Sequence, residues 1–346
     1  MAIKYIGSVK DRMAADKVKE IYKELKNDMG DVVEPISLHA INPELLEGIW
    51  NILREVVVVN GKMTRIQKEA IGAAVSEANR CNYCVDAHTI MLIGLKDYAT
   101  ASAIVKRKPD MINDTLLRNL VKWSLDTRNF NSVIIKFPPF SSQQAPEAIG
   151  TAVFFHYLNR MVSAFLGPTI LPVNINFLKG SMKKMAGKMF ASTLSREKEQ
   201  KIFKPKNFDN VLDRIPWTLC NPQVRHVYSQ FYLTLNSLAE KYVPEEVRKF
   251  INNELNNWDG VDQFITTDKD AKLQDVSEQH QELAGVLYTQ AFAPHKININ
   301  DIEKLKRLFP QDTDEAILVS FAWASFQAAL YIGIQVGKKF NTECAN

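Results

Sequence analysis

Hydrophobic residues recur three and four positions apart along most of the 346-residue chain, and the alternation typical of strands is rare. The first such segment spans residues 8–29, before Gly30, a natural helix stop. The pattern predicts an all-α fold with a loop at residues 129–144. Further helices are expected at residues 43–59, 98–107, 113–128, 145–167, 223–242, 244–257, 283–292, 300–308 and 312–336.

The stretch from Glu69 to His88 reads EAIGAAVSEANRCNYCVDAH and carries most of the chemistry in the sequence. It follows a turn signal at Asn60-Gly61 and a candidate N-cap at Thr64. We expect one helix or a pair of helices here, continuing to about Leu95.

Cys81, Cys84 and His88 are spaced three and four residues apart, so on a helix they share one face. An imidazole one turn from a thiol is a proton acceptor, and the thiolate is the reactive form of cysteine. Two cysteines at C-x-x-C spacing can also close into a disulfide, which makes a two-electron redox couple. Glu69 enters an apolar run, so it lies either at a solvated helix end or inside the protein with a raised pKa.

Two other interpretations of these residues remain open. The thiols can be buried and inert beside a core histidine. They can also bind zinc, which would need a fourth ligand from elsewhere in the chain. Haem attachment is excluded because Val85, not histidine, follows the second cysteine.

The arrangement E-x11-C-x-x-C-x3-H, with V-S-x-x-N before the first cysteine, resembles the AhpD-like alkylhydroperoxidase branch of the carboxymuconolactone decarboxylase family. Tyr83 between the cysteines and the alanine before His88 resemble the peroxidase-related members. The likeness extends upstream through V-x-x-I-Y-x-x-L and PELL to a tryptophan. It implies an AhpD-like helical fold and an alkylhydroperoxidase-like enzyme with an antioxidant role.

This resemblance implies that Glu69, Cys81, Cys84 and His88 are catalytic. Glu69 would take a proton from Cys84 through His88 or a water molecule, and the Cys84 thiolate would attack the peroxide. Cys81 would then condense with the sulfenic acid to a disulfide. The order of the cysteines stays open, because the first cysteine of a C-x-x-C at a helix start can instead have the low pKa.

The family likeness implies no bound cofactor and no metal, but an external dithiol reductant such as a lipoyl group on a carrier protein. It also implies coupling to a peroxiredoxin and assembly into homo-oligomers. Two alternative functions are a decarboxylase-like lyase without cysteine chemistry and a non-catalytic redox-sensing protein.

Two further groups of residues are candidates for the site. Tyr83 is a poor base at neutral pH, so packing is expected rather than a role in proton transfer. His156, Asn159 and Arg160 share one face of the helix at residues 145–167. They would line a pocket or support the cysteine helix, or else form an interface or an internal salt link.

A faint internal repeat divides the chain. Glu147-Ala148-Ile149 recurs as Glu315-Ala316-Ile317, 168 residues later, and the matched positions of the cysteines and His88 hold no cysteine or histidine. We therefore expect a catalytic half, a basic connector that is a solvated face, and a degenerate half that acts as a structural partner. Their bounds are residues 1–178, 179–206 and 207–346.

Charge and composition change the picture little. The 43 basic and 39 acidic residues give a net charge of +4, which argues against a nucleic-acid surface. The first residues lack the apolar core of a secretory signal, and no run reaches about 18 apolar residues, so neither export nor a membrane span is expected. Four cysteines without framework spacing indicate a cytoplasmic protein, with Cys220 and Cys344 as free thiols.

Overall fold

The computed structural model describes residues 3–170, 176–204, 206–261 and 268–340, and every regular element in these ranges is helical, which confirms the predicted all-α fold. The prediction of a loop at residues 129–144 was wrong in one detail, because this segment contains a short helix. The helices are α1 (Asp16–Met29), α2 (Glu34–Ser37), α3 (Pro43–Leu53), α4 (Arg65–Ala78), α5 (Asn82–Gly94), α6 (Tyr98–Val105), α7 (Thr115–Leu125), α8 (Val133–Lys136), α9 (Ala145–Phe165), α10 (Asn176–Leu194), α11 (Pro222–Tyr242), α12 (Glu245–Asn256), α13 (Asp268–Leu273), α14 (Glu278–Phe292), α15 (Ile299–Leu308) and α16 (Thr313–Gly337).

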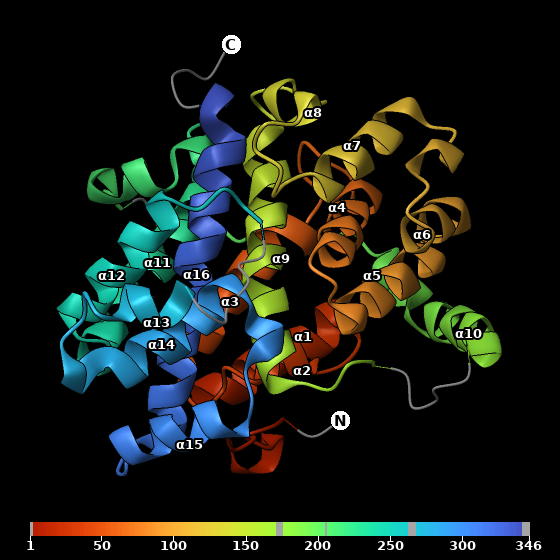
Figure 1. Ribbon diagram of the computed structural model, residues 1–346. Helices are drawn as coiled ribbons and strands as arrows, with labels where there is room; N and C mark the ends of the chain where they lie inside the picture. Colours follow the sequence, from red (N-terminus) through yellow and green to blue (C-terminus); the bar gives the residue numbers. More distant parts are fainter. Residues whose placement is uncertain (1–2, 171–175, 205, 262–267, 341–346) are drawn as a thin grey trace.

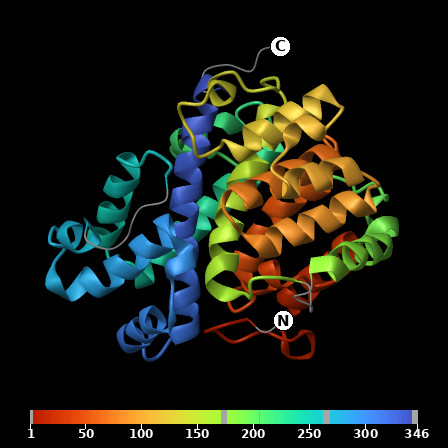
Figure 2. The ribbon, with the colours of Figure 1, turned by 45° about the vertical axis from the view of Figure 1, so that its right-hand side comes forward.

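Two long helices, α9 and α16, pack side by side through the middle of the molecule (Figures 1 and 2). Both are buried around almost their whole circumference, and most of their residues are apolar. Helices α4 to α7 pack on one side of this pair, and α11 to α15 on the other (Figure 1). One continuous hydrophobic core joins the two sides.

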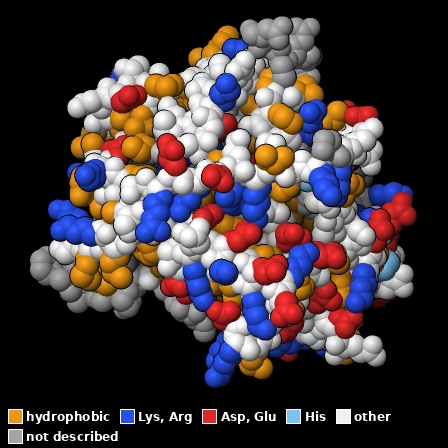
Figure 3. Space-filling view, turned by 180° about the vertical axis from the view of Figure 1, so that it is seen from behind, with side chains coloured by type: hydrophobic (Ala, Val, Ile, Leu, Met, Phe, Trp, Pro, Cys, Tyr) orange, Lys and Arg blue, Asp and Glu red, His pale blue; other side chains and the backbone are white. Residues whose placement is uncertain are grey.

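The segment Thr313–Phe340 is long and apolar enough to cross a membrane by length and composition alone. However, 89% of its most apolar window is buried inside the protein, where this helix packs in the core. On the face shown in Figure 3, Lys and Arg side chains are interspersed with Asp and Glu over much of the surface.

The helix order on the two sides of the core is compatible with the proposed repeat. The succession α7, α8, α9 precedes the connector, and α14, α15, α16 ends the described chain at the same sequence offset. The division into a catalytic and a degenerate half nevertheless stays a prediction, because shared order alone does not establish common descent.

The basic connector does not form a simple solvated face, as the sequence suggested. Its helix α10 packs across α5, and Gly94 and Gly187 let the two backbones approach closely, since a Cβ on Gly94 would lie 2.9 Å from the Gly187 carbonyl oxygen. Lys183 forms an ion pair with Asp86 on α5 (2.6 Å), and Lys201 binds Glu24 on α1 (2.6 Å). The connector is therefore held to the first half by charge pairs, and its end contacts α11, where Phe203 stacks on His226.

A fully buried histidine, His39, ties the chain after α2 to the central helix α9. Its Nδ1–H is donated to the Ile36 carbonyl (3.1 Å), and its Nε2 lies 2.6 Å from the Tyr157 hydroxyl, which donates to it. Both ring nitrogens are thus satisfied in the neutral form. Burial lowers the pKa of His39 from 6.5 to about 4.

We expect folding stability to decline as the pH falls from 6.5 toward 4. Over this range an unfolded chain binds a proton at His39 that the folded chain does not bind, so protonation favours unfolding. The pKa difference corresponds to roughly 2 to 3 kcal/mol between pH 7 and pH 4.5. Denaturant unfolding at both pH values should show that His39→Gln costs less stability at pH 4.5 than at pH 7. An equal cost at both would contradict the buried neutral ring.

Candidate functional site

The motif forms two helices joined by a tight turn rather than one continuous helix. Thr64 caps α4, and its side chain and that of Gln67 form a reciprocal capping box. After α4 ends, Arg80 takes a left-handed conformation (φ 56°), and Cys81 follows as the N-cap of α5. The Cys81 amide donates to the Ser76 carbonyl (2.9 Å), which closes the turn. The turn places the first cysteine at a helix start and the second inside the first turn.

The two sulfur atoms of the motif face each other. Cys81 Sγ and Cys84 Sγ share a hydrogen bond at 2.9 Å, and both are free thiols. The residues are 4% and 2% exposed, so the pair is sheltered from solvent. A disulfide has an S–S bond of about 2.05 Å, so closing the pair needs an approach of less than about 1 Å. The arrangement can therefore switch between dithiol and disulfide with little movement.

Glu69 lies at the centre of a buried charge network. It is fully buried on α4, where Oε1 accepts from Arg65 Nε (2.7 Å) and Oε2 accepts from His88 Nδ1 (2.6 Å). Burial alone would raise the pKa of Glu69, but the positive charges and hydrogen bonds of Arg65 and His88 hold it below its ordinary value. The expectation of a buried glutamate with a raised pKa was therefore wrong, because Arg65, one turn away on the same helix, supplies a compensating charge.

His88 is oriented from two sides. Its Nδ1–H bond to Glu69 leaves Nε2 as the basic nitrogen of the neutral ring. The ring packs edge-on against Phe155 of α9, with centroids 4.4 Å apart. Cys84 lies one turn earlier on α5, within the reach of neighbouring side chains on one helix face. The structure thus pairs the acid with the imidazole and the two thiols with each other, and His88 follows Cys84 by one turn on α5.

The thiol of Cys84 does not ionise readily by itself. Burial raises the pKa of Cys84 well above its ordinary value, and the hydrogen bond and charge of Cys81 raise it further. A hydrogen bond from the Asn159 side chain opposes both effects. Attack by Cys84 would therefore need a base to remove its proton.

The polar face of α9 supports the turn before the cysteines. The sequence had left open whether this face supports the cysteine helix or forms an interface. Asn79, the residue that ends α4, donates to His156 Nδ1 (3.0 Å) and to Asn159 Oδ1 (2.9 Å). Asn159 in turn donates to the Ser76 hydroxyl (3.1 Å). His156 Nε2–H donates to Thr127 (2.9 Å), whose own proton goes to a backbone carbonyl, so the ring is held neutral.

Arg160 connects the site to the second half. It is 3% exposed, and it donates Nε–H to the Ala291 carbonyl (2.9 Å) and Nη1–H to the His156 carbonyl (2.7 Å). Burial lowers the pKa of His156 well below its ordinary value, and the charges of Arg160 and Arg128 lower it further. His156 and Asn159 therefore support the cysteine turn, whereas Arg160 lies where the two halves meet.

Tyr83 points away from the proton-transfer groups. The residue is buried, and its hydroxyl donates to Glu34 Oε2 (2.9 Å) on α2. Burial and the Glu34 carboxylate raise the pKa of Tyr83 far above its ordinary value. Its hydroxyl is thus directed to Glu34 rather than to Glu69 or His88, in line with the expected packing.

Sequence reasoning missed several contributors, namely Arg65, Ser76 and Asn79. Arg65 precedes Glu69 by four residues, a spacing that predicts an ion pair on a helix. Ser76 and Asn79 are the serine and asparagine of the V-S-x-x-N element. Their role was hidden because their partner, Asn159, is about eighty residues away in sequence and meets them only in the fold.

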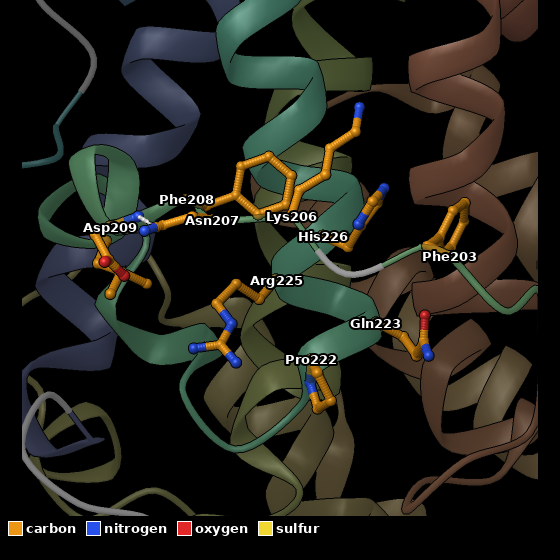
Figure 4. Close-up of a pocket in the computed structure, with 10 residues that line it drawn as sticks. Phe203, Lys206, Asn207, Phe208, Asp209, Pro222, Gln223, Arg225 and His226 are labelled. Carbon is orange, nitrogen blue, oxygen red and sulfur yellow. Dashed lines mark hydrogen bonds between the residues drawn. The ribbon is translucent and has the colours of Figure 1, made fainter.

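Two cavities flank the cysteine turn. One, of about 960 Å³, lies over the outer face of α5 and is lined by Asn82, Val85 and residues of α6 and α10. The other, of about 180 Å³, lies on the side of α9 and the second half. A further cavity of about 370 Å³ surrounds His226 (Figure 4), but its lining includes none of the candidate catalytic residues. Glu69, Cys81, Cys84 and His88 line none of the three cavities, whereas Asn159 and Arg160 line the smaller cavity beside the turn.

Within the described ranges, no three His, Cys, Asp or Glu side chains are grouped as a metal site would require. The expectation that Cys220 is a free thiol was also wrong, because Cys220 takes part in a disulfide. Cys344, also expected to be free, lies outside the described residues.

The segment that carries the motif is similar to a known protein family. Residues 43–99 match the carboxymuconolactone decarboxylase family, and this match contains Glu69, both motif cysteines and His88. The matched segment is formed by α3, the π-helical turn Arg54–Val58, α4 and α5.

Two similar proteins extend beyond this segment. The chain is 28% identical over 343 residues to an alkyl hydroperoxide reductase of Mycobacterium tuberculosis. The alignment covers 97% of this chain and 95% of that protein. It is also similar to the crystal structure of an alkylhydroperoxidase AhpD core, an uncharacterized peroxidase-related protein from Ralstonia eutropha. That likeness has a TM-score of 0.45 and 18% identity, and it covers 54% of this chain and 97% of the other.

Proposed function

We propose that the protein is a thiol-dependent peroxidase that reduces organic hydroperoxides through the Cys81–Cys84 pair. One observation carries the proposal: a dithiol with sulfurs 2.9 Å apart lies on the same helix as an imidazole bonded at 2.6 Å to a buried carboxylate. A core of inert thiols does not need this acid and ring, whereas peroxide reduction needs a means of removing a thiol proton.

The first step forms the thiolate. His88 Nε2, directly or through one water molecule, accepts the proton of Cys84, and the Glu69 carboxylate stabilises the resulting imidazolium. The lowered pKa of Glu69 suits this role, because the acid stays ionised and holds the ring while the proton rests on His88. This modifies the simpler expectation that Glu69 itself takes the proton.

The second step breaks the O–O bond. The Cys84 thiolate attacks the outer oxygen of the hydroperoxide, an S–O bond forms, and the alkoxide leaves and takes a proton from His88 to become an alcohol. Cys84 is now a sulfenic acid. The Cys81 sulfur attacks it, the S–S bond forms, and hydroxide leaves with the Cys81 proton as water.

An external dithiol completes the cycle. It attacks the Cys81–Cys84 disulfide, passes through a mixed disulfide, and leaves as its own disulfide while both cysteines return to thiols. A lipoyl group on a carrier protein is the reductant that we propose, with a peroxiredoxin as a coupled partner and a homo-oligomer as the assembly. A reducing compartment such as the cytoplasm suits an enzyme that starts each cycle as a dithiol.

The comparisons support the peroxidase class. A similar protein that aligns with nearly the whole chain is named an alkyl hydroperoxide reductase. A decarboxylase-like lyase remains the second candidate function because the matched domain carries that family's name. The lyase needs no thiol, so blocking both cysteines separates the two.

The test is steady-state consumption of an organic hydroperoxide with a dithiol donor, for the wild type and for a Cys81→Ser/Cys84→Ser double variant. We expect turnover with the wild type and only background consumption with the double variant. A redox sensor would instead oxidise once and stop, even with excess dithiol. Equal consumption by both proteins would exclude the thiol mechanism.

A further inference from the structure

The smaller cavity beside the cysteine turn is built from both halves of the chain. Its volume is about 180 Å³. The first half contributes Asn79 and Arg80 from the turn and Arg160 from α9, and the second half contributes Phe292 and His295. The half without the C-x-x-C motif therefore forms one wall of a cavity next to the turn that carries the redox pair.

Two residues that line this cavity are each linked to one of the motif cysteines. Arg80 lines it and directly precedes Cys81 in the chain. Asn159 lines it as well, and the Asn159 side chain hydrogen-bonds the thiol of Cys84. The cavity is therefore bordered by a residue next to Cys81 in the chain and by a residue that hydrogen-bonds Cys84.

The lining is cationic. Arg80, Arg128 and Arg160 all border the cavity together with His295, and no Asp or Glu is among the described residues that line it. The contacts of Arg160 with the Ala291 and His156 carbonyls hold its guanidinium in place. Guanidinium groups in a partly buried site bind carboxylates through strong charge-assisted hydrogen bonds.

The size of the cavity limits the ligand. About 180 Å³ corresponds to roughly six water molecules at their liquid volume of about 30 Å³ each. A compact molecule of a few carbon atoms fits this space, and a long acyl chain does not.

From these observations we infer that the cavity binds the carboxylate of small hydroperoxy acids and makes them preferred substrates, with Arg80 and His295 as specificity-determining residues. The inference rests on the proposed peroxidase function and refines it. It also gives the second half a role, since His295 adds a ring nitrogen to the lining of this cavity.

The test compares two probes that differ by one charge, a hydroperoxide of a four- or five-carbon carboxylic acid and its methyl ester. The readout is the rate of Cys81–Cys84 disulfide formation in the full-length reduced protein. We expect the wild type to react about tenfold faster with the acid, and the ratio of the two rates to fall about fivefold in Arg80→Gln and in His295→Asn. High salt should lower the same ratio.

Lys96→Gln is the matched control. Lys96 is an exposed cation that, like Arg80, lies in a left-handed conformation (φ 69°), but at the other end of α5 and outside the cavity lining. The Lys96→Gln variant should leave the ratio of the acid rate to the ester rate unchanged. Equal rates for acid and ester in the wild type would overturn the inference and leave the peroxidase proposal intact. So would an Arg80→Gln variant that slows both probes equally. If neither probe oxidises the pair, both proposals fail.

Discussion

Replacing Cys84 by serine should lower dithiol-driven peroxide turnover by at least about a thousandfold, because the attacking sulfur is lost. Serine is nearly the same size, so the fold should persist. The measurement is peroxide consumption under saturating dithiol, with circular dichroism to confirm that the variant is folded. Activity within tenfold of the wild type would show that Cys84 is not the nucleophile.

The companion variant Cys81→Ser fixes the order of the two cysteines. If Cys84 attacks first, this variant should still react once with peroxide and stop as a sulfenic acid on Cys84, which a dimedone-type probe labels. Sulfenic-acid labelling that is seen only in the Cys84→Ser variant would show that Cys81 attacks the peroxide first. That outcome is chemically reasonable, because Cys81 occupies the helix N-cap, a position that favours a thiolate.

The second large effect is expected for Glu69→Gln. Glutamine cannot stabilise a protonated His88 as the carboxylate does, so turnover should fall by about 10² to 10⁴. The change also leaves the buried Arg65 charge without its partner, at a cost of roughly 3 kcal/mol in folding stability. Turnover per folded molecule and denaturant unfolding measure the two effects separately.

Glu147→Gln is the control for the structural part of that effect. Glu147 is also a buried acid, paired with Lys68 at 2.8 Å, and it accepts from the backbone amides of Lys62 and Met63 at the approach to α4. Its loss should cost similar stability but change turnover of the folded protein only a few-fold. Equal losses of turnover in both variants would assign Glu69 a purely structural role.

Acid unfolding gives a second readout of Glu69. Its folded pKa is depressed, so its contribution to stability is present above the unfolded value of 4.5 and is lost as the pH falls through the folded pKa. Glu69→Gln should therefore remove part of the decline in stability below pH 4.5.

Helical spacing was enough to predict the all-α fold and most helix positions, because apolar stripes such as that of α1 bury one face against the core. The break between α4 and α5 was not predicted as such. Arg80 takes the left-handed conformation at that turn, and no glycine or proline stands there to signal it. The sequence therefore allowed one helix or two.

The candidate site was predicted where its partners lie close in sequence. Glu69, Cys81, Cys84 and His88 share a short stretch, and helical spacing alone placed the thiols and the ring together. The contact between Asn159 and Cys84 depends on the packing of α9, which local spacing cannot show. The same holds for Lys183, which the sequence presented as a surface charge and the fold pairs with Asp86.

The most direct test of the central claim is the oxidation state of the two cysteines after one equivalent of hydroperoxide. Peptide mass mapping of the reduced wild-type protein should find one intramolecular Cys81–Cys84 disulfide, lighter by two hydrogens, and excess dithiol should restore both thiols. Peroxide consumption that leaves both thiols reduced would contradict the account.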